Sequence, residues 1–158
     1  MARIEVVPAT LAHAREMARF GLREADRIEV LRSHGHSEEK ALRSSLRRSR
    51  YALTALVDDA PVAMFGVAPS GLISTSGVIW LLATDESEKH WMRFGKISRD
   101  AVEFFRTQFS VIENFVDAEN TISINWLRWL GFTLAPEPVP FGVAQTPFYH
   151  FEWRASHV

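Results

Sequence analysis

One stretch of the sequence restricts the fold more than any other, because it places a long helix between two apolar runs. Residues 78–83 are apolar throughout, as expected of a strand that is covered on both faces. A helix is predicted over residues 86–108. Its apolar stripe contains Trp91, Phe94, Ala101, Val102 and Phe105. Residues 111–116 form another strand-like run, so we expect a parallel crossover from the first strand to the second.

The segments around this unit predict further strands and shorter helices. Residues 51–57 and 62–68 flank a turn sequence at Asp58 and Asp59, which predicts a β-hairpin. Helices are predicted over residues 11–21, 22–34 and 38–48, with Thr10 and Ser37 as N-caps of the first and third, and a fourth helix is predicted between the N-cap Asn120 and the C′ residue Gly131. Short strands are predicted over residues 4–7, 132–134 and 148–153, with the Pro-rich segment 136–147 as the connection between the last two. The order of elements is typical of a mixed α/β (α+β) domain.

Composition narrows the class of protein. The chain has 158 residues, so one domain over residues 1–158 is expected. It contains no cysteine, which excludes disulfides, zinc–thiolate sites and thiol nucleophiles. A net charge of -1 argues against a nucleic-acid partner. The longest apolar run is far shorter than the roughly 20 residues that span a membrane, and no signal-peptide core is present. We therefore expect a cytoplasmic protein without a membrane partner.

A motif near the C-terminus carries a resemblance to a known family. The sequence Asp117-Ala118-Glu119-Asn120, followed by residues 124–132 ending in Gly-Phe, resembles the last conserved block of GNAT acyltransferases. There a strand ends near an Asn, a helix follows and Gly-Phe closes it. More narrowly, the chain resembles the internal virion protein A family of T7-like phages and prophages. That likeness covers residues 61–69, 80–85, 116–132 and 138–151.

The resemblance implies a GNAT-like fold with a mixed, mostly antiparallel sheet and helices on both faces. Strands 78–83 and 111–116 would splay apart at their C-terminal ends. Acyl-CoA, with acetyl-CoA as the expected co-substrate, would lie in that gap and meet an amine acceptor. The resemblance assigns cofactor contacts to Leu82, Ala83, Thr84, Lys89, Arg93 and Asn120. The pyrophosphate would lie at the start of the long helix, where free N–H groups favour anions.

Two features depart from the GNAT pattern. Residues 85–93 contain no glycine, whereas a glycine-rich loop lets backbone approach phosphate. Three acids there, Asp85, Glu86 and Glu88, would repel an anion, or they simply complement the helix dipole. Seven residues after Asn120, where many GNAT enzymes carry a proton-donating tyrosine, the chain has Leu127. Ser123 on the same helix is the remaining candidate for the catalytic face.

Candidate bases lie on the second predicted helix. Glu24, Asp26 and Glu29 could bind a cationic acceptor or take its proton. The alternative is an ordinary charged helix face paired with neighbouring arginines. His34 and His36 have His-x-His spacing but no evident third ligand nearby, so no metal site is predicted.

Two functions follow from the resemblance. The first is an acyl-CoA-dependent N-acyltransferase, such as an N-acetyltransferase, with an unknown amine acceptor. The second is a non-catalytic GNAT-fold phage protein that acts in particle assembly or delivery and is packaged in the virion. Partners would then be phage structural proteins. An exposed indole among Trp126 and Trp129 would mark a self-association patch, so a homodimer is a further expectation.

Overall fold

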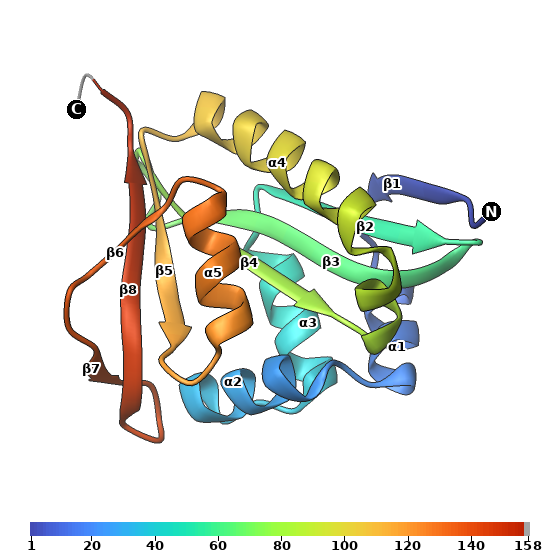
Figure 1. The fold of residues 1–158 in the computed structure, drawn as a ribbon, viewed down its shortest axis with the longest axis horizontal. Coiled ribbons are helices and arrows are strands. Elements are labelled where there is room, and N and C mark those ends of the chain that lie inside the picture. The colour runs from blue at the N-terminus through green and yellow to red at the C-terminus, as the bar shows by residue number, and fades with distance from the viewer. Residues whose placement is uncertain (157–158) are drawn as a thin grey trace.

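The computed structural model describes residues 1–156 as one mixed sheet flanked by helices (Figure 1). The helices are α1 (Leu11–Phe20), α2 (Glu24–His34), α3 (Glu38–Arg48), α4 (Trp91–Gln108) and α5 (Thr121–Trp129), and a 3₁₀ helix η1 covers Asp85–His90. The strands are β1 (Ile4–Pro8), β2 (Tyr51–Val57), β3 (Ala60–Pro69), β4 (Ser76–Ala83), β5 (Val111–Asp117), β6 (Thr133–Leu134), β7 (Val139–Phe141) and β8 (Thr146–Arg154).

The strand order confirms the predicted fold class and the crossover. The strands run β1-β2-β3-β4-β5-β8-β6, and β7 pairs with β8 outside this path. β4 and β5 are parallel neighbours, and the other strand pairs of the described sheet are antiparallel. The Pro-rich segment before β8, read from the sequence as a connection only, contains β7. Since β7 supplies a hairpin partner to β8, the C-terminal edge of the sheet is broader than the sequence suggests.

Local chemistry fixes several of the predicted boundaries. Asp58 and Asp59 have φ of 47° and 70°, the paired positive values of a tight hairpin turn, and they join β2 to β3. Thr10 and Ser37 cap α1 and α3 by accepting backbone N–H groups, as their sequence positions predict. Gly131, at φ 96°, follows the end of α5.

The predicted helix over residues 86–108 is wrong at its start. Residues Asp85–His90 form η1, and the α-helix begins only at Trp91. The backbone N–H and the hydroxyl of Ser87 both donate to the Thr84 carbonyl, which tightens the first turn into 3₁₀ geometry. His90, at φ -126° and ψ 32°, then interrupts the helical backbone.

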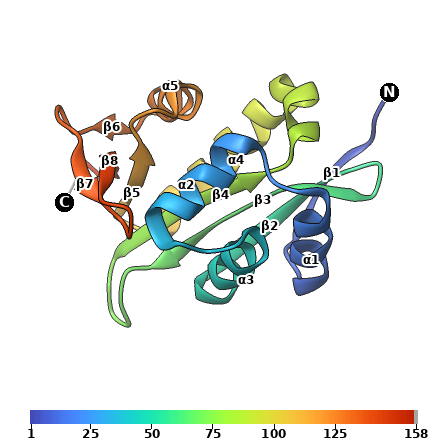
Figure 2. The same cartoon turned by 90° about the horizontal axis from the view of Figure 1, so that it is seen from below.

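Two cores sandwich the sheet. On one face, α4 and α5 pack on the sheet around Phe105 and Ile112, both essentially inaccessible. On the other face, α1, α2 and α3 pack around Met17, Leu42 and Met64 (Figure 2). Among residues 1–156, no helix combines the length and apolar character needed to cross a bilayer.

Candidate active site

The two parallel strands separate soon after they meet. β4 and β5 pair only where Ser76–Val78 faces Val111–Glu113, and they diverge toward their C-terminal ends (Figure 1). Just past the last paired residues, the Asn114 side-chain N–H donates to the Ile79 carbonyl at 2.7 Å. This side chain replaces a main-chain bond between the strands, so the opening begins at Asn114.

Helix α2 bridges the opening at the C-terminal ends of both strands (Figure 2). On the β4 side, the Ala83 N–H donates to Asp26 Oδ2 at 2.9 Å, and the Arg23 N–H donates to the Ala83 carbonyl at 2.8 Å. On the β5 side, the Asp117 N–H donates to Glu29 Oε1 at 2.7 Å. Backbone groups that have no neighbouring strand are therefore satisfied by carboxylates one helical turn apart.

The C-terminal half of α2 strengthens this bridge. Arg32 donates to Asp117 and Glu119, each at 2.9 Å, so the helix is bound to the end of β5 by an ion pair as well. The turn after β7 covers the helix end, where the Val143 N–H donates to the Ser33 carbonyl at 3.0 Å. Both ends of α2 are thus fixed to the sheet.

A cavity of about 320 Å³ lies in the opening. Its lining comes from helices on both faces of the sheet as well as from the two diverging strands. Representative residues are Asp26 and Glu29 of α2, Leu81 of β4, Val116 of β5, Ser98 of α4 and Ser123 of α5. The cavity therefore lies between β4 and β5 and is lined from both faces of the sheet.

Burial changes the acidity of the two α2 carboxyls in this cavity. Desolvation raises the pKa of Glu29 to about 7, against the opposing effect of the Asp117 N–H bond. Desolvation also raises the pKa of Asp26, although the Arg23 guanidinium, bonded at 3.0–3.1 Å, favours its charged form. Glu29 is therefore a group that exchanges a proton near neutral pH, as general bases require.

The fold of the chain is similar to that of solved acetyltransferase structures. One is the acetyltransferase of the GNAT family from Streptococcus pneumoniae, with TM-score 0.66, 10% identity, and coverage of 96% of this chain and 99% of that chain. The ribosomal-protein-alanine N-acetyltransferase from Brucella melitensis is similar with a TM-score of 0.69 and 16% identity, and the match covers 95% of this chain and 99% of that chain. An acetyltransferase from Bacillus subtilis, solved in complex with CoA, is similar with a TM-score of 0.61 and 13% identity. That match covers 98% of this chain and 99% of that chain.

This chain has the GNAT fold. No protein-family model matches its sequence, and no curated protein matches it either. Identities of 10–16% establish the fold alone. The narrower likeness to phage internal virion proteins stays a prediction, since none of these three structures is described as a phage protein.

The structure separates the three carboxylates predicted as bases. Asp26 and Glu29 line the cavity, whereas the Glu24 side chain is 79% exposed and pairs loosely with Arg27 at 3.9 Å. Ser123 lines the cavity from α5, together with Leu127, the residue at the usual tyrosine position of GNAT enzymes. The cavity-lining Ser98 of α4 was not singled out in the sequence, where one serine in a helix carries no signal.

On β4 of the GNAT fold, the backbone groups that remain open differ from those expected. Both main-chain groups of Ala83 are already bonded to α2. Because successive residues of an antiparallel pair alternate in the direction of their hydrogen bonds, Leu82 points its groups toward Met64 of β3. Leu81 has the same parity as Ala83 and lines the cavity, so its N–H and C=O face the opening.

The residues expected around a pyrophosphate are engaged elsewhere. Thr84 is 5% exposed, and its hydroxyl donates to the Val62 carbonyl. Lys89 pairs with Glu86 at 2.9 Å, and Arg93 donates to the Ala2 carbonyl at 2.8 Å. The bases near the start of α4 are thus partly neutralised or turned away along the surface.

Asn120 lies at the start of α5. Its side-chain oxygen accepts the Ser123 N–H at 3.3 Å, which caps the helix. Its side-chain nitrogen is buried and has no hydrogen-bond partner within residues 1–156. A buried amide N–H without a partner is costly, and Asn120 does not line the cavity, so the structure shows only its capping role.

Proposed function

We propose that this protein is an N-acyltransferase that moves an acyl group from acyl-CoA, with acetyl-CoA the simplest donor, to an amine. The observation that carries this proposal is Glu29, a carboxyl whose pKa is near 7, in a cavity lined from both faces of the sheet. The GNAT fold and a CoA-bound structural neighbour support the choice of donor. The fold alone would leave the chemistry open.

The residues present fit the pantetheine arm of the donor. Leu81 offers an N–H and a C=O at the opening, and the amide-bearing arm needs such strand-like partners. The cavity wall toward α4 and α5 is apolar, with Val102, Phe105 and Trp126 among its residues. The phosphate end fits less well, because Asp85, Glu86 and Glu88 form the first turn of η1.

Transfer requires an uncharged amine, and Glu29 supplies the means. Its carboxylate takes a proton from the ammonium group of the acceptor, and the freed amine attacks the thioester carbonyl. A C–N bond forms as the C–S bond breaks, and CoA leaves as its thiolate or thiol. The nitrogen loses a second proton as the amide forms, and because Leu127 cannot relay it, this proton passes to the departing sulfur through water or the Ser123 hydroxyl. Asp26, paired with Arg23, instead fixes the end of β4.

The experiment combines binding and rate. Calorimetry with acetyl-CoA should show binding, and transfer to a panel of amines should follow the ionisation of Glu29, with kcat/KM rising with pH up to about 7. Glu29→Gln should abolish this rise of kcat/KM with pH and remove most of the activity, while acetyl-CoA still binds. Glu24→Gln, on the same helix but exposed, is the matched control and should keep both the transfer activity and the binding of acetyl-CoA. If millimolar acetyl-CoA produces neither heat nor a melting shift, the transferase proposal is wrong.

Two observations favour a second function, a non-catalytic GNAT-fold protein of phage particle assembly. The acidic, glycine-free approach to α4 and the engagement of Lys89 and Arg93 disfavour a diphosphate. Trp129 is 54% exposed, with the Arg99 guanidinium 4.5 Å from its ring centroid, which supports a contact with a second copy or another protein. Failure to bind acetyl-CoA together with a stable dimer on sedimentation would favour this second function.

A further inference from the structure

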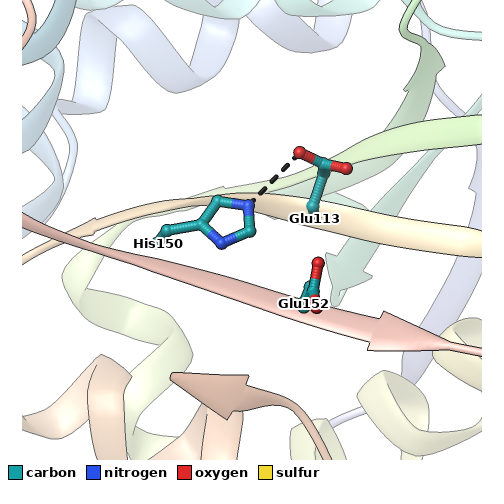
Figure 3. A group of neighbouring side chains, drawn as sticks. All are labelled: Glu113, His150 and Glu152. Carbon is teal, nitrogen blue, oxygen red and sulfur yellow. Dashed lines mark hydrogen bonds and ion pairs between the residues drawn. The ribbon is translucent and has the colours of Figure 1, made fainter. Parts of the chain in front are cut away.

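A group of metal-ligating side chains lies outside the cavity, on β5 and β8. Glu113 comes from β5, and His150 and Glu152 come from alternate positions of β8, so all three project from the same face of the sheet (Figure 3). Glu113 and Glu152 are direct cross-strand partners. One ligand atom from each residue lies within 4.8 Å of the other two.

The spacing within this group suits a small divalent ion. His150 Nε2 and Glu113 Oε1 are 3.2 Å apart. Two ligands that each bind zinc at about 2.0–2.1 Å and form an angle of about 100° would have this separation. The side chains are about one-third exposed, at 31%, 34% and 30% for His150, Glu113 and Glu152, so an ion could reach them from solvent.

Charge in this group is unbalanced. Carboxylates directly opposite each other on paired strands repel, and Glu113 and Glu152 are such a pair. Arg154 donates to Glu152 Oε1 at 3.0 Å and offsets one of the two charges. A cation between the carboxylates would offset the other, with the second oxygen of Glu152 still free to ligate.

We propose that Glu113, His150 and Glu152 bind a divalent transition-metal ion of the Zn²⁺ type, with remaining positions filled by water. The ligand set decides the class of ion, because imidazole nitrogen with carboxylate oxygen suits Zn²⁺ and its neighbours, whereas Mg²⁺ and Ca²⁺ prefer oxygen alone. Three protein ligands on half-buried strands are sufficient for such a site. This inference does not depend on acyl transfer.

The position of the site indicates what it does. Glu113 pairs with Val78, at the last point where β4 and β5 are still joined. His150 packs against Phe115, with ring centroids 5.2 Å apart, and Phe115 lines the cavity. An ion here would link β5 to β8 beside the start of the opening, so it stabilises the strands that shape the cavity and takes no part in chemistry.

Calorimetry of the full chain with ZnCl₂, after treatment with EDTA, tests the proposal. We expect one saturable Zn²⁺ per chain, a higher melting temperature with the ion, and no such response to MgCl₂. His150→Asn and Glu113→Gln should each weaken Zn²⁺ binding by more than about tenfold, since loss of even an outer-shell partner costs about 10–100-fold.

His36→Asn is the matched control, because His36 and His34 form a pair of imidazoles outside the proposed site, with ring centroids 5.4 Å apart. It should leave Zn²⁺ binding unchanged. Melting in EDTA establishes that each variant is folded, and Glu152→Gln replaces any variant that is not. No saturable binding, or binding lost in His36→Asn and retained in His150→Asn, would overturn the proposal.

Discussion

Replacing Glu29 with Gln should make the stability of the protein depend differently on pH. Folding raises the pKa of this carboxyl from 4.5 to about 7, so the folded state holds its proton more tightly than the unfolded chain does. Below pH of about 4.5 the carboxyl is protonated in both states and costs nothing. As pH rises from about 4.5 to about 7 the wild type loses stability, because the unfolded chain releases this proton while desolvation keeps it bound in the folded state.

The size of the effect follows from the same two values. A tenfold change in a proton-binding constant is about 1.4 kcal/mol, so the shift of Glu29 corresponds to at most about 3 kcal/mol above pH 7. Gln has no charge to desolvate, and its side-chain oxygen can still accept the Asp117 N–H. The stability of Glu29→Gln relative to wild type should therefore increase by about 1–3 kcal/mol between pH 5 and pH 8.

Urea unfolding of both proteins at fixed ionic strength, at half-unit pH intervals, measures this difference directly. Glu24→Gln removes a carboxylate from the same helix, but that side chain is 79% exposed and loses little solvation on folding. It should show no comparable trend. If the stability difference between Glu29→Gln and wild type is the same at pH 5 and pH 8, Glu29 is not desolvated and its role as a base loses its support.

Three further substitutions test how the opening is built. Asp26→Ala leaves Arg23 and the Ala83 N–H without their buried partner and should cost about 3–5 kcal/mol in urea unfolding, with Asp26→Asn less harmful. Gly142→Ala should lower stability by more than about 1 kcal/mol, because Gly142 has φ 74° and an added Cβ would lie 2.5 Å from Ser33 Cα. Trp126→Ala should cost less than the about 3–5 kcal/mol of a fully buried aromatic, since Trp126 is only partly buried. A larger loss, or dissociation of a dimer without loss, would contradict that placement.

Local sequence signals predicted the parts of the fold that depend on neighbouring residues. The hairpin at Asp58 and Asp59, the caps at Thr10 and Ser37 and the crossover from β4 to β5 all follow from short patterns. The hairpin and the caps depend only on backbone conformations or hydrogen bonds within a few residues. The crossover is indicated by an apolar periodicity that can be recognised within one segment of the sequence. The 3₁₀ start before α4 was missed because it depends on competing bonds of Ser87.

The site required contacts that no short pattern carries. Glu29 and Asp117 are 88 residues apart and Arg32 and Asp117 are 85 apart, yet they meet at the end of β5. The sequence gives no means of distinguishing Glu24, Asp26 and Glu29, because which of them are buried depends on how α2 packs on the sheet. The group of Glu113 with His150 was likewise invisible, since only the register of β5 and β8 brings these residues together.

The attachment of α2 to both strands fixes the width of the opening between the ends of β4 and β5. An α-helix is a stiff spacer that advances about 1.5 Å per residue, so the distance between its bonds to Ala83 and to Asp117 is set by the count from Asp26 to Glu29. Moving either carboxylate by one turn would change that spacing by about 5.4 Å and force β4 and β5 to new positions. The spacing of Asp26 and Glu29 on α2 therefore sets the width of the opening between β4 and β5. Inserting or deleting residues between these two carboxylates is a direct way to widen or narrow the opening.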